Sequence, residues 1–400
     1  MRTAKRGLIE VDFSDARASV PVDAQFTVAA SGITAIFGPR GCGNARLARL
    51  IAGLERLPTG FCAIDGERWQ DEDTFRPPHL RRIGHVFQRT ILFSNLSVRR
   101  NLLYDAPKPK PLPIGLDEVV ELLDLAPLLE RSPSLISDAE RQRVAIGKAL
   151  LSQPRLLMME EPLGSVDRST KRELLPFLER LHEKLTLPMI YIGHDMADIE
   201  RLADYLVIMK QGVVIAAGPL GALQSDIALP LAMRQEAAVS LDAVVDGYDE
   251  SYGLLVLLFK GVRLLVPGEP LKPGARQRLR IAARDVSVAR DMPSASSIVN
   301  VFPARIKAFV PFGDAEITLL LALEAGGSVA QFLSRITRRS FDSLGLKDGM
   351  DVFAQVTGMS LVPTSEILLK GLAAATCGED PVQESSDRLH PLTFGQGIAF

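Results

Sequence analysis

The chain has 400 residues, 47% of them hydrophobic and 24% charged, a balance typical of a globular protein with about two or three domains. The formal net charge of −2 gives no reason to expect binding to nucleic acid. Three cysteines do not make a disulfide framework, which fits a reducing compartment. The first residues lack the apolar region of a signal peptide, and no apolar run approaches about 18 residues. We therefore expect a chain that does not span a membrane but can dock on a protein that does.

Strand-like and helix-like segments alternate along the first half of the chain. Short apolar runs predict buried strands, and apolar residues at helical spacing predict helices between them. The predicted strands include 33–37, 60–65, 83–87, 155–159 and 189–193, and the predicted helices cover 45–54, 116–129, 140–151, 171–184 and 196–202. This alternation predicts an α/β fold with a mainly parallel sheet that is covered on both faces.

The pattern changes near residue 233. From there to about residue 364, short β-like runs alternate with Gly, Pro and Asp turns, which predicts one or two small all-β barrels. These runs are 254–259, 262–266, 277–281, 304–309, 316–321 and 352–356. We expect an α/β domain at 1–232, a β-barrel region at 233–364 and a flexible polar tail at 365–400.

A glycine-rich loop follows the strand-like run 33–37 and opens a helix-like segment, which is the geometry of a phosphate-binding P-loop. Gly38 and Gly43 have the spacing of G-x-x-x-x-G-K-[ST], but Asn44 replaces the lysine and Ala45 replaces the hydroxyl residue. The candidate phosphate-binding residues are Gly38, Pro39, Arg40, Gly41, Cys42, Gly43, Asn44, Ala45 and Arg46. On this motif alone, an ordinary glycine turn is an equally good interpretation.

Four further motifs follow the loop in order. They are Val86-Phe87-Gln88, Ser137-Asp138-Ala139-Glu140, the run 156–167 that contains Glu160-Glu161-Pro162, and Gly193-His194-Asp195. Their order and spacing resemble the ATP-binding subunit of ABC transporters over roughly residues 1–230. Segments 278–289, 296–300 and 334–346 resemble the regulatory region of the molybdate importer's ATP-binding subunit, and 295–363 resembles its small molybdate-binding β-barrel module.

The resemblance implies ATP and Mg²⁺ as cofactors and gives catalytic roles to several residues. Glu161 would polarise the attacking water, and His194 would contact the γ-phosphate. Gln88 would sense Mg²⁺ and the attacking water, and Glu160 stands where the family has the aspartate that orients the metal. Ser137 is the surviving serine of the signature that faces the nucleotide, and Asp167 resembles the loop aspartate that crosses the dimer interface.

Several positions depart from the family pattern, and each departure weakens the nucleotide site. Asn44 can donate only neutral hydrogen bonds, worth about 1 kcal/mol against roughly 1.5–3 kcal/mol for a charge-assisted bond. Ala45 offers no hydroxyl to Mg²⁺, and Glu160 is one methylene longer than the usual aspartate.

The signature segment and the adenine platform are altered as well. Asp138 and Ala139 replace two glycines, and the carboxylate would repel an incoming phosphate by about 4 kcal/mol at a distance of about 4 Å and an effective dielectric constant of 20. The nearest aromatic candidates for stacking on adenine are Phe13 and Phe26. We expect weak nucleotide binding and impaired hydrolysis.

Three functional interpretations stay open. The first is an energy-coupling subunit of a molybdate importer, peripheral at the cytoplasmic face of the inner membrane. The second is a non-hydrolysing family member that acts as a scaffold, as the partner of an intact ATPase or as an oxyanion sensor. The third is a decayed copy without activity. For the first, the resemblance implies a membrane permease, a homodimer or a pairing with an intact ATPase, and indirectly a periplasmic molybdate-binding protein.

Two surfaces follow from these interpretations. A helical insertion at about 89–150 would face the permease, with the apolar run Ile91-Leu92-Phe93 as its contact, although an internal packing cluster is equally good on sequence alone. The β-barrel module would bind molybdate, although an ordinary turn and a solvated strand face explain the same residues. The candidate oxyanion donors are Ser296, Ser297 and Asn300, with positive charge from Arg335, Arg338 and Arg339.

Overall fold

The computed structural model describes residues 5–17, 19–88, 91–107, 112–164, 166–325 and 328–361. The tail at 365–400, for which the sequence predicts flexibility, lies outside the described residues, as does Ser165 of the motif run 156–167. Among the described residues, no helix has the length and apolar character needed to cross a membrane.

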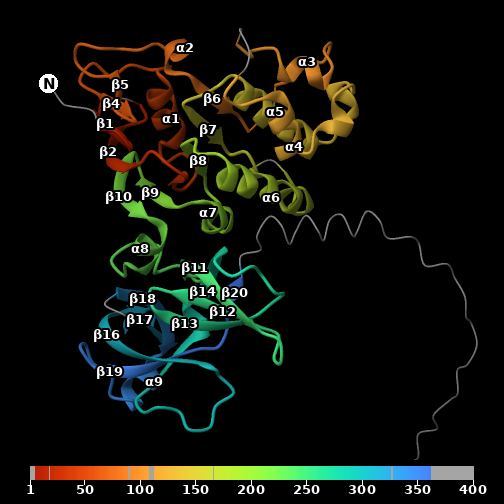
Figure 1. Ribbon diagram of the computed structural model, residues 1–400. Helices are drawn as coiled ribbons and strands as arrows, with labels where there is room; N and C mark the ends of the chain where they lie inside the picture. The colour runs from red at the N-terminus through yellow and green to blue at the C-terminus, as the bar shows by residue number, and fades with distance from the viewer. Residues whose placement is uncertain are drawn as a thin grey trace, which may run out of the picture.

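Ten strands from the first part of the chain form one sheet in the order β5-β4-β1-β2-β10-β9-β3-β8-β7-β6 (Figure 1). Their bounds are β1 (Leu8–Asp15), β2 (Val22–Ala29), β3 (Ile33–Phe37), β4 (Phe61–Ile64), β5 (Glu67–Gln70), β6 (Ile83–Val86), β7 (Leu156–Glu160), β8 (Met189–Gly193), β9 (Tyr205–Lys210) and β10 (Val213–Pro219). The half that contains β9, β3, β8, β7 and β6 is parallel. The pairs β1–β2, β1–β4, β4–β5 and β9–β10 are antiparallel.

The sheet is therefore mixed, whereas the sequence predicts a mainly parallel sheet. The difference comes from connection length. β1 and β2, β4 and β5, and β9 and β10 are joined by short turns, which can connect only antiparallel neighbours. The parallel strands are connected through helices, as the alternating pattern predicts.

Helices cover both faces of this sheet, because successive residues of the buried parallel strands enter different cores. Ile36, Ile190 and Val207 pack with α1, whereas Ala35 and Tyr191 pack with α5, α6 and α7. The helix bounds are α1 (Asn44–Ala52), α2 (Pro78–Arg81), α3 (Val98–Leu102), α4 (Leu116–Leu122), α5 (Asp138–Leu151), α6 (Arg168–Lys184), α7 (Met196–Leu202) and α8 (Leu220–Ser225).

The predicted helix at 116–129 is shorter than expected. α4 ends at Leu122, and Asp124 has a left-handed backbone with a φ of 48°. A short 3-10 turn then follows at Ala126–Leu128 and contains Pro127. Both features interrupt an α-helix although the apolar spacing continues through them.

The second part of the chain forms two antiparallel sheets of five strands around one shared core. One has the order β13-β12-β11-β14-β20 and the other β15-β19-β16-β17-β18. The bounds are β11 (Ala238–Asp249), β12 (Leu254–Phe259), β13 (Val262–Pro267), β14 (Arg276–Ala282), β15 (Val286–Ala289), β16 (Asn300–Phe312), β17 (Glu316–Ala325), β18 (Ser328–Thr337), α9 (Arg338–Ser343), β19 (Asp351–Val356) and β20 (Ser360–Leu361). This all-β unit fits the predicted barrel region.

Two arginines of the all-β part tie it to the rest of the chain. Arg278 donates to the carbonyl oxygens of Arg201 (3.2 Å) and Ala203 (2.8 Å) and pairs with Asp204. Arg335 is 5% exposed and donates to carbonyl oxygens of Ala232, Arg234 and Gln235 in the connecting segment. The prediction that Arg335 supplies positive charge to an oxyanion is therefore wrong, because its guanidinium is buried against backbone oxygens.

Candidate functional site

The glycine-rich loop joins the carboxyl end of β3 to the N-terminus of α1. Gly43 is the N-cap of α1 and has a φ of 104°, and Gly41 has a φ of 79°, so both positions favour glycine. A Cβ on Gly38 would lie 2.5 Å from both Cys42 Sγ and the carbonyl oxygen of Met209. The loop needs its glycines, and its backbone leads into a helix N-terminus as a phosphate cradle requires.

The side chains at the start of α1 make contacts within the protein. Asn44 Oδ1 accepts a hydrogen bond from Cys42 Sγ at 3.1 Å. Arg46 pairs with Asp15 at 2.6 Å and with Glu55 at 2.7 Å. Because Arg46 is already paired with two carboxylates, its predicted role in phosphate binding has no support from these contacts.

Arg40, His194 and Glu161 come from three different loops, and His194 contacts both of the other two. His194 follows β8 and Glu161 follows β7, so both stand at the carboxyl edge of the parallel strands. His194 Nδ1 lies 2.7 Å from Glu161 Oε1, and Arg40 Nη2 lies 3.4 Å from His194 Nε2. Glu161 has a left-handed backbone with a φ of 46°, a strained conformation found more often at functional sites.

Gly164 is a site residue that the sequence analysis does not single out. A Cβ at this position would lie 2.6 Å from Glu161 Oε2 and 3.3 Å from Gln88 Nε2. The missing side chain thus makes room for both predicted catalytic groups and places Gln88 beside Glu161. A glycine two residues after Glu161-Pro162 is the only sequence signal for this role.

Two of the positions expected to hold Mg²⁺ differ from the family pattern. Glu160 Oε1 lies 2.8 Å from His85 Nε2, and the His85 ring stacks on Phe87 at 3.9 Å. Ala45 contributes no hydroxyl oxygen. Among the described residues, no group of three or more His, Cys, Asp and Glu side chains could hold a metal ion.

The signature segment begins α5. Ser137 is its N-cap: its hydroxyl accepts from Glu140 N–H at 3.1 Å, and Glu140 accepts from Ser137 N–H at 2.7 Å. Asp138 forms an ion pair with Arg141 one turn later. The cost of about 4 kcal/mol that the sequence argument assigns to Asp138 is therefore too high, because Arg141 offsets part of its charge.

The two aromatic candidates for an adenine platform are both in the core. Phe13 is 0% exposed and Phe26 is 5% exposed, and they pack with α1 and the antiparallel strands. Neither ring can stack on a base, so this expectation is wrong. Alternation along β1 and β2 turns both side chains inward.

Comparison with known proteins places the chain. Residues 22–164 match the ABC transporter family and residues 296–361 match the TOBE domain. The chain is 62% identical over 354 residues to the molybdenum import ATP-binding protein ModC 1 of Bradyrhizobium diazoefficiens, covering 88% of this chain and 95% of that protein. The chain belongs to the ModC family of ABC-transporter ATP-binding proteins.

Two further relatives have the same kind of name. The ModC protein of Rhodopseudomonas palustris strain BisB18 is 57% identical over 366 residues, which is 91% of this chain and 96% of that protein. ModC 2 of Bradyrhizobium diazoefficiens is 58% identical over 374 residues, 94% of this chain but 42% of that longer protein. This chain therefore spans nearly the whole length of two of these relatives and less than half of the third.

A partly buried cation of α6 pairs with two carboxylates that follow β8. Asp167, expected at the dimer interface, is the N-cap of α6, and hydrogen bonds from Thr170 and Ser169 lower its pKa. One turn later, Lys171 Nζ lies 2.6 Å from Asp195 and 2.9 Å from Asp198 of the next helix. Asp195 follows His194 directly and is the N-cap of α7. Lys171 therefore holds the start of α7 next to His194.

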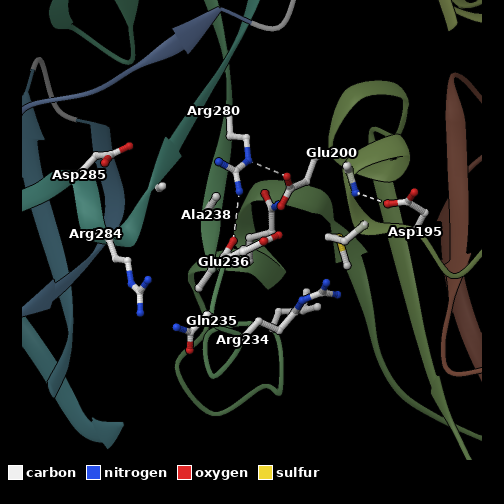
Figure 2. Close-up of a pocket in the computed structure, with 15 residues that line it drawn as sticks. Asp195, Glu200, Arg234, Gln235, Glu236, Ala238, Arg280, Arg284 and Asp285 are labelled. Atoms are coloured by element: carbon white, nitrogen blue, oxygen red, sulfur yellow. Dashed lines mark hydrogen bonds and ion pairs between the residues drawn. The ribbon is translucent and has the colours of Figure 1, made fainter. Parts of the chain in front are cut away.

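A cavity of about 480 Å³ opens on the other side of Asp195, between α7 and the all-β part (Figure 2). Arg280 from β14 pairs with Glu200 of α7 at 2.8 Å and donates to the carbonyl oxygen of Glu236. Arg234 of the connecting segment places its guanidinium 5.7 Å from the ring centre of Phe37, the last residue of β3. The connecting segment therefore contacts the end of the strand before the P-loop, and Arg280 links this segment to α7.

The predicted oxyanion donors are in different environments. Asn300 is 6% exposed. Its side-chain amide accepts from the Leu265 N–H (2.9 Å) and donates to the Leu265 carbonyl (2.8 Å), as a neighbouring strand would. Ser296 and Ser297 are exposed, and Ser296 Oγ accepts from Ile298 N–H at 3.1 Å. Of the three, the two serines present their hydroxyls to solvent.

Replacing Lys171 with Met keeps the side-chain length and removes the cation between Asp195 and Asp198. Breaking a buried ion pair costs about 3–5 kcal/mol and an exposed one about 0.2–1 kcal/mol, and we expect about 2 kcal/mol because Lys171 is 22% and Asp195 43% exposed. Urea unfolding monitored by circular dichroism measures the loss. Lys184→Met, an exposed lysine at the end of the same helix, is the matched control and should leave the free energy of unfolding unchanged.

The same variant should show a pH dependence of known sign. Burial raises the pKa of the Asp198 carboxyl, and Lys171 opposes that rise. Without Lys171 the folded-state pKa of Asp198 rises further above the unfolded value of about 3.9. The folded protein then loses stability as the pH rises, because the carboxyl ionises more readily in the unfolded chain. The loss of stability in Lys171→Met should therefore be larger at pH 8 than at pH 5. An equal loss at both values would contradict the assignment of Lys171 as the counterion.

Proposed function

We propose that this chain is the energy-coupling ATP-binding subunit of an importer for molybdate, peripheral at the cytoplasmic face of the cell membrane. The observation that carries this is the alignment of Arg40, His194, Glu161 and Gln88 at the carboxyl edge of the parallel strands, beside the P-loop. The names of the relatives, molybdenum import ATP-binding proteins, supply the transported element. We place the boundary between the nucleotide-binding part and the regulatory part at 232/233.

We further propose that hydrolysis is impaired in this subunit. Asn44 has no charge and is engaged with Cys42, Ala45 has no metal-binding hydroxyl, and Glu160 is engaged with His85. The cradle itself keeps the shape that holds phosphates, since Gly38, Gly41 and Gly43 retain the backbone geometry. The alternative is a non-hydrolysing member that pairs with an intact ATPase, and the same contacts favour it.

Restoring the lost side chains tests the impairment. We expect the wild-type chain to release phosphate far more slowly than about one per second, a typical enzyme rate. The combined variant Asn44→Lys, Ala45→Thr, Asp138→Gly and Ala139→Gly should gain orders of magnitude, while each single change gains little, because such groups act as a unit.

The matched control for this experiment is the combined variant with Glu161→Gln, which should lose the gained activity if the new turnover comes from this site. Steady-state phosphate release by the purified chain is the measurement. Wild-type turnover of about one per second or more would contradict the impairment.

An apolar patch on the helical insertion is the proposed permease contact. Ile91 is 77% exposed, and the rings of Phe93 and Tyr104 pack at a tilt of 37° with their centres 4.3 Å apart. Asn101 fixes the patch, since its side chain accepts from Phe93 N–H at 2.8 Å and donates to the Phe93 carbonyl at 3.0 Å. A rigid, exposed apolar surface of this kind fits docking on another protein.

Changing this patch should separate docking from folding. Ile91→Asp and Phe93→Ala should leave the thermal unfolding midpoint nearly unchanged and reduce co-purification with the importer's membrane permease. Tyr252→Asp, a residue of the β11–β12 turn with 78% exposure, is the control and should co-purify like the wild type. Unchanged co-purification of a folded Ile91→Asp, Phe93→Ala double variant would count against this surface.

We also propose that two copies of the chain, or this chain and an intact ATPase, pair through the surfaces of Ser137 and Asp167. Both residues are exposed, and each is the N-cap of a helix. A periplasmic molybdate-binding protein would act with such a complex only through the permease.

Molybdate binding by the all-β part is the second proposed function. Because Asn300 and Arg335 are engaged with backbone groups, the predicted set is reduced to the hydroxyls of Ser296 and Ser297 and the exposed cations Arg338 and Arg339. Two hydroxyls are too few to enclose a dianion, so we expect binding only when two copies combine their donors.

Isothermal titration of the full chain with molybdate, with sulfate as competitor, tests this. Ser297→Ala should abolish the heat, whereas Ser251→Ala, another exposed serine of the all-β part, should not. No heat at about 1 mM molybdate with a folded, dimeric chain would end the proposal.

A further inference from the structure

Arg40 lies in the P-loop and Arg46 in the first turn of α1, and their contacts differ. Arg46 is held by two carboxylates, and its hydrogen bond to Glu55 is the largest cause of its raised pKa. Arg40 stands in the loop itself and is exposed, and its Nη2 lies 3.4 Å from His194 Nε2. Arg46 thus serves the fold, while the charge of Arg40 remains available to a ligand.

The contacts of His194 fix which way its protons point. An arginine side chain can only donate, so His194 Nε2 is the acceptor of the 3.4 Å contact from Arg40 Nη2. The proton of the neutral ring is then on Nδ1 and is donated to Glu161 Oε1 at 2.7 Å. Arg40 therefore contacts the ring nitrogen of His194 that is not bonded to Glu161.

We propose that Arg40 supplies the phosphate-binding cation that this loop lacks at position 44. The inference rests on the proposed function only in placing a polyphosphate at the loop. Arg40 carries a permanent charge and a fork of N–H donors that matches phosphate oxygens. It also lies on the same loop as Gly41, where an added Cβ would meet nothing within 4 Å, so the space above the loop is open.

The exchange favours binding on physical grounds. Arg40 gives up one long hydrogen bond to a neutral imidazole and gains charge-assisted bonds to phosphate oxygens, which are about twice as strong as neutral ones. His194 Nε2 is released at the same time and faces the same space. Because the cation comes from a side chain, this binding does not require Mg²⁺.

The competing interpretation is that Arg40 only orients His194 and does not touch the ligand. A double-mutant cycle with His194→Ala separates the two, because a residue that acts through His194 has no effect once His194 is gone. If Arg40 binds phosphate directly, its removal weakens binding in both backgrounds.

The experiment is a titration of the full-length chain with inorganic tripolyphosphate and with ATP, both in EDTA, at two salt concentrations. Arg40→Ala should weaken both ligands about tenfold or more and make the affinity less sensitive to salt. Arg40→Lys keeps the charge and should keep part of the affinity. Adding Asn44→Lys to Arg40→Ala should restore most of the loss, because it returns the cation to its usual position.

Arg49→Ala is the matched control, since it removes an exposed cation from the far end of the same helix and should leave the affinity unchanged. Equal affinities of the wild type and Arg40→Ala would overturn the proposal, as would an equal loss in Arg49→Ala or an effect of Arg40→Ala that vanishes in His194→Ala. A wild-type chain that binds neither ligand also overturns it, while the proposed role on the permease would still stand on the co-purification result.

Discussion

One carboxylate holds the strand before the P-loop in place and joins the two parts of the chain. Asp204 Oδ2 accepts from Ile33 N–H at 2.9 Å and lies 2.5 Å from His182 Nε2, and Oδ1 pairs with Arg278 at 3.2 Å. Burial works to raise the pKa of this carboxyl, but these partners together hold it below its usual value. A Cβ on Gly32 would lie 2.1 Å from Asp204 Oδ2, so the approach depends on a glycine at that position.

The position of the site follows from this constraint. Asp204 fixes the start of β3 against α6 and β14, and β3 lies between β9 and β8 in the parallel half of the sheet. The neighbouring strands β7 and β8 then end beside the loop, which brings Glu161 and His194 within 2.7 Å of each other. The all-β part contacts the start of β3 through Arg278 and Asp204, and the connecting segment contacts the carboxyl end of β3 through Arg234 near Phe37.

Ordered motifs predict the composition of the site, because each motif ends a strand and parallel strands end at one edge. This reasoning is enough to predict that Glu161 and His194 lie close together. The partners of Arg46, Arg335 and Asn300 cannot be predicted in this way, since each depends on a contact with a residue far away in the sequence. The sequence shows that these side chains are polar and capable of binding, but only the packed chain shows that backbone oxygens and carboxylates already occupy them.

Three of the motif residues have a role in the fold itself. Ser137, Asp167 and Asp195 are N-caps, and loss of a cap costs about 0.5–2 kcal/mol whether or not a nucleotide binds. The side chain of Ala45 is exposed, so a threonine or alanine there makes little difference to folding. At position 45 the usual hydroxyl side chain would thus serve only the ligand, whereas Ser137, Asp167 and Asp195 are residues that the fold itself uses. Retention of these caps is consequently no argument for hydrolysis, and the functional question depends on the groups without a folding role, foremost Arg40.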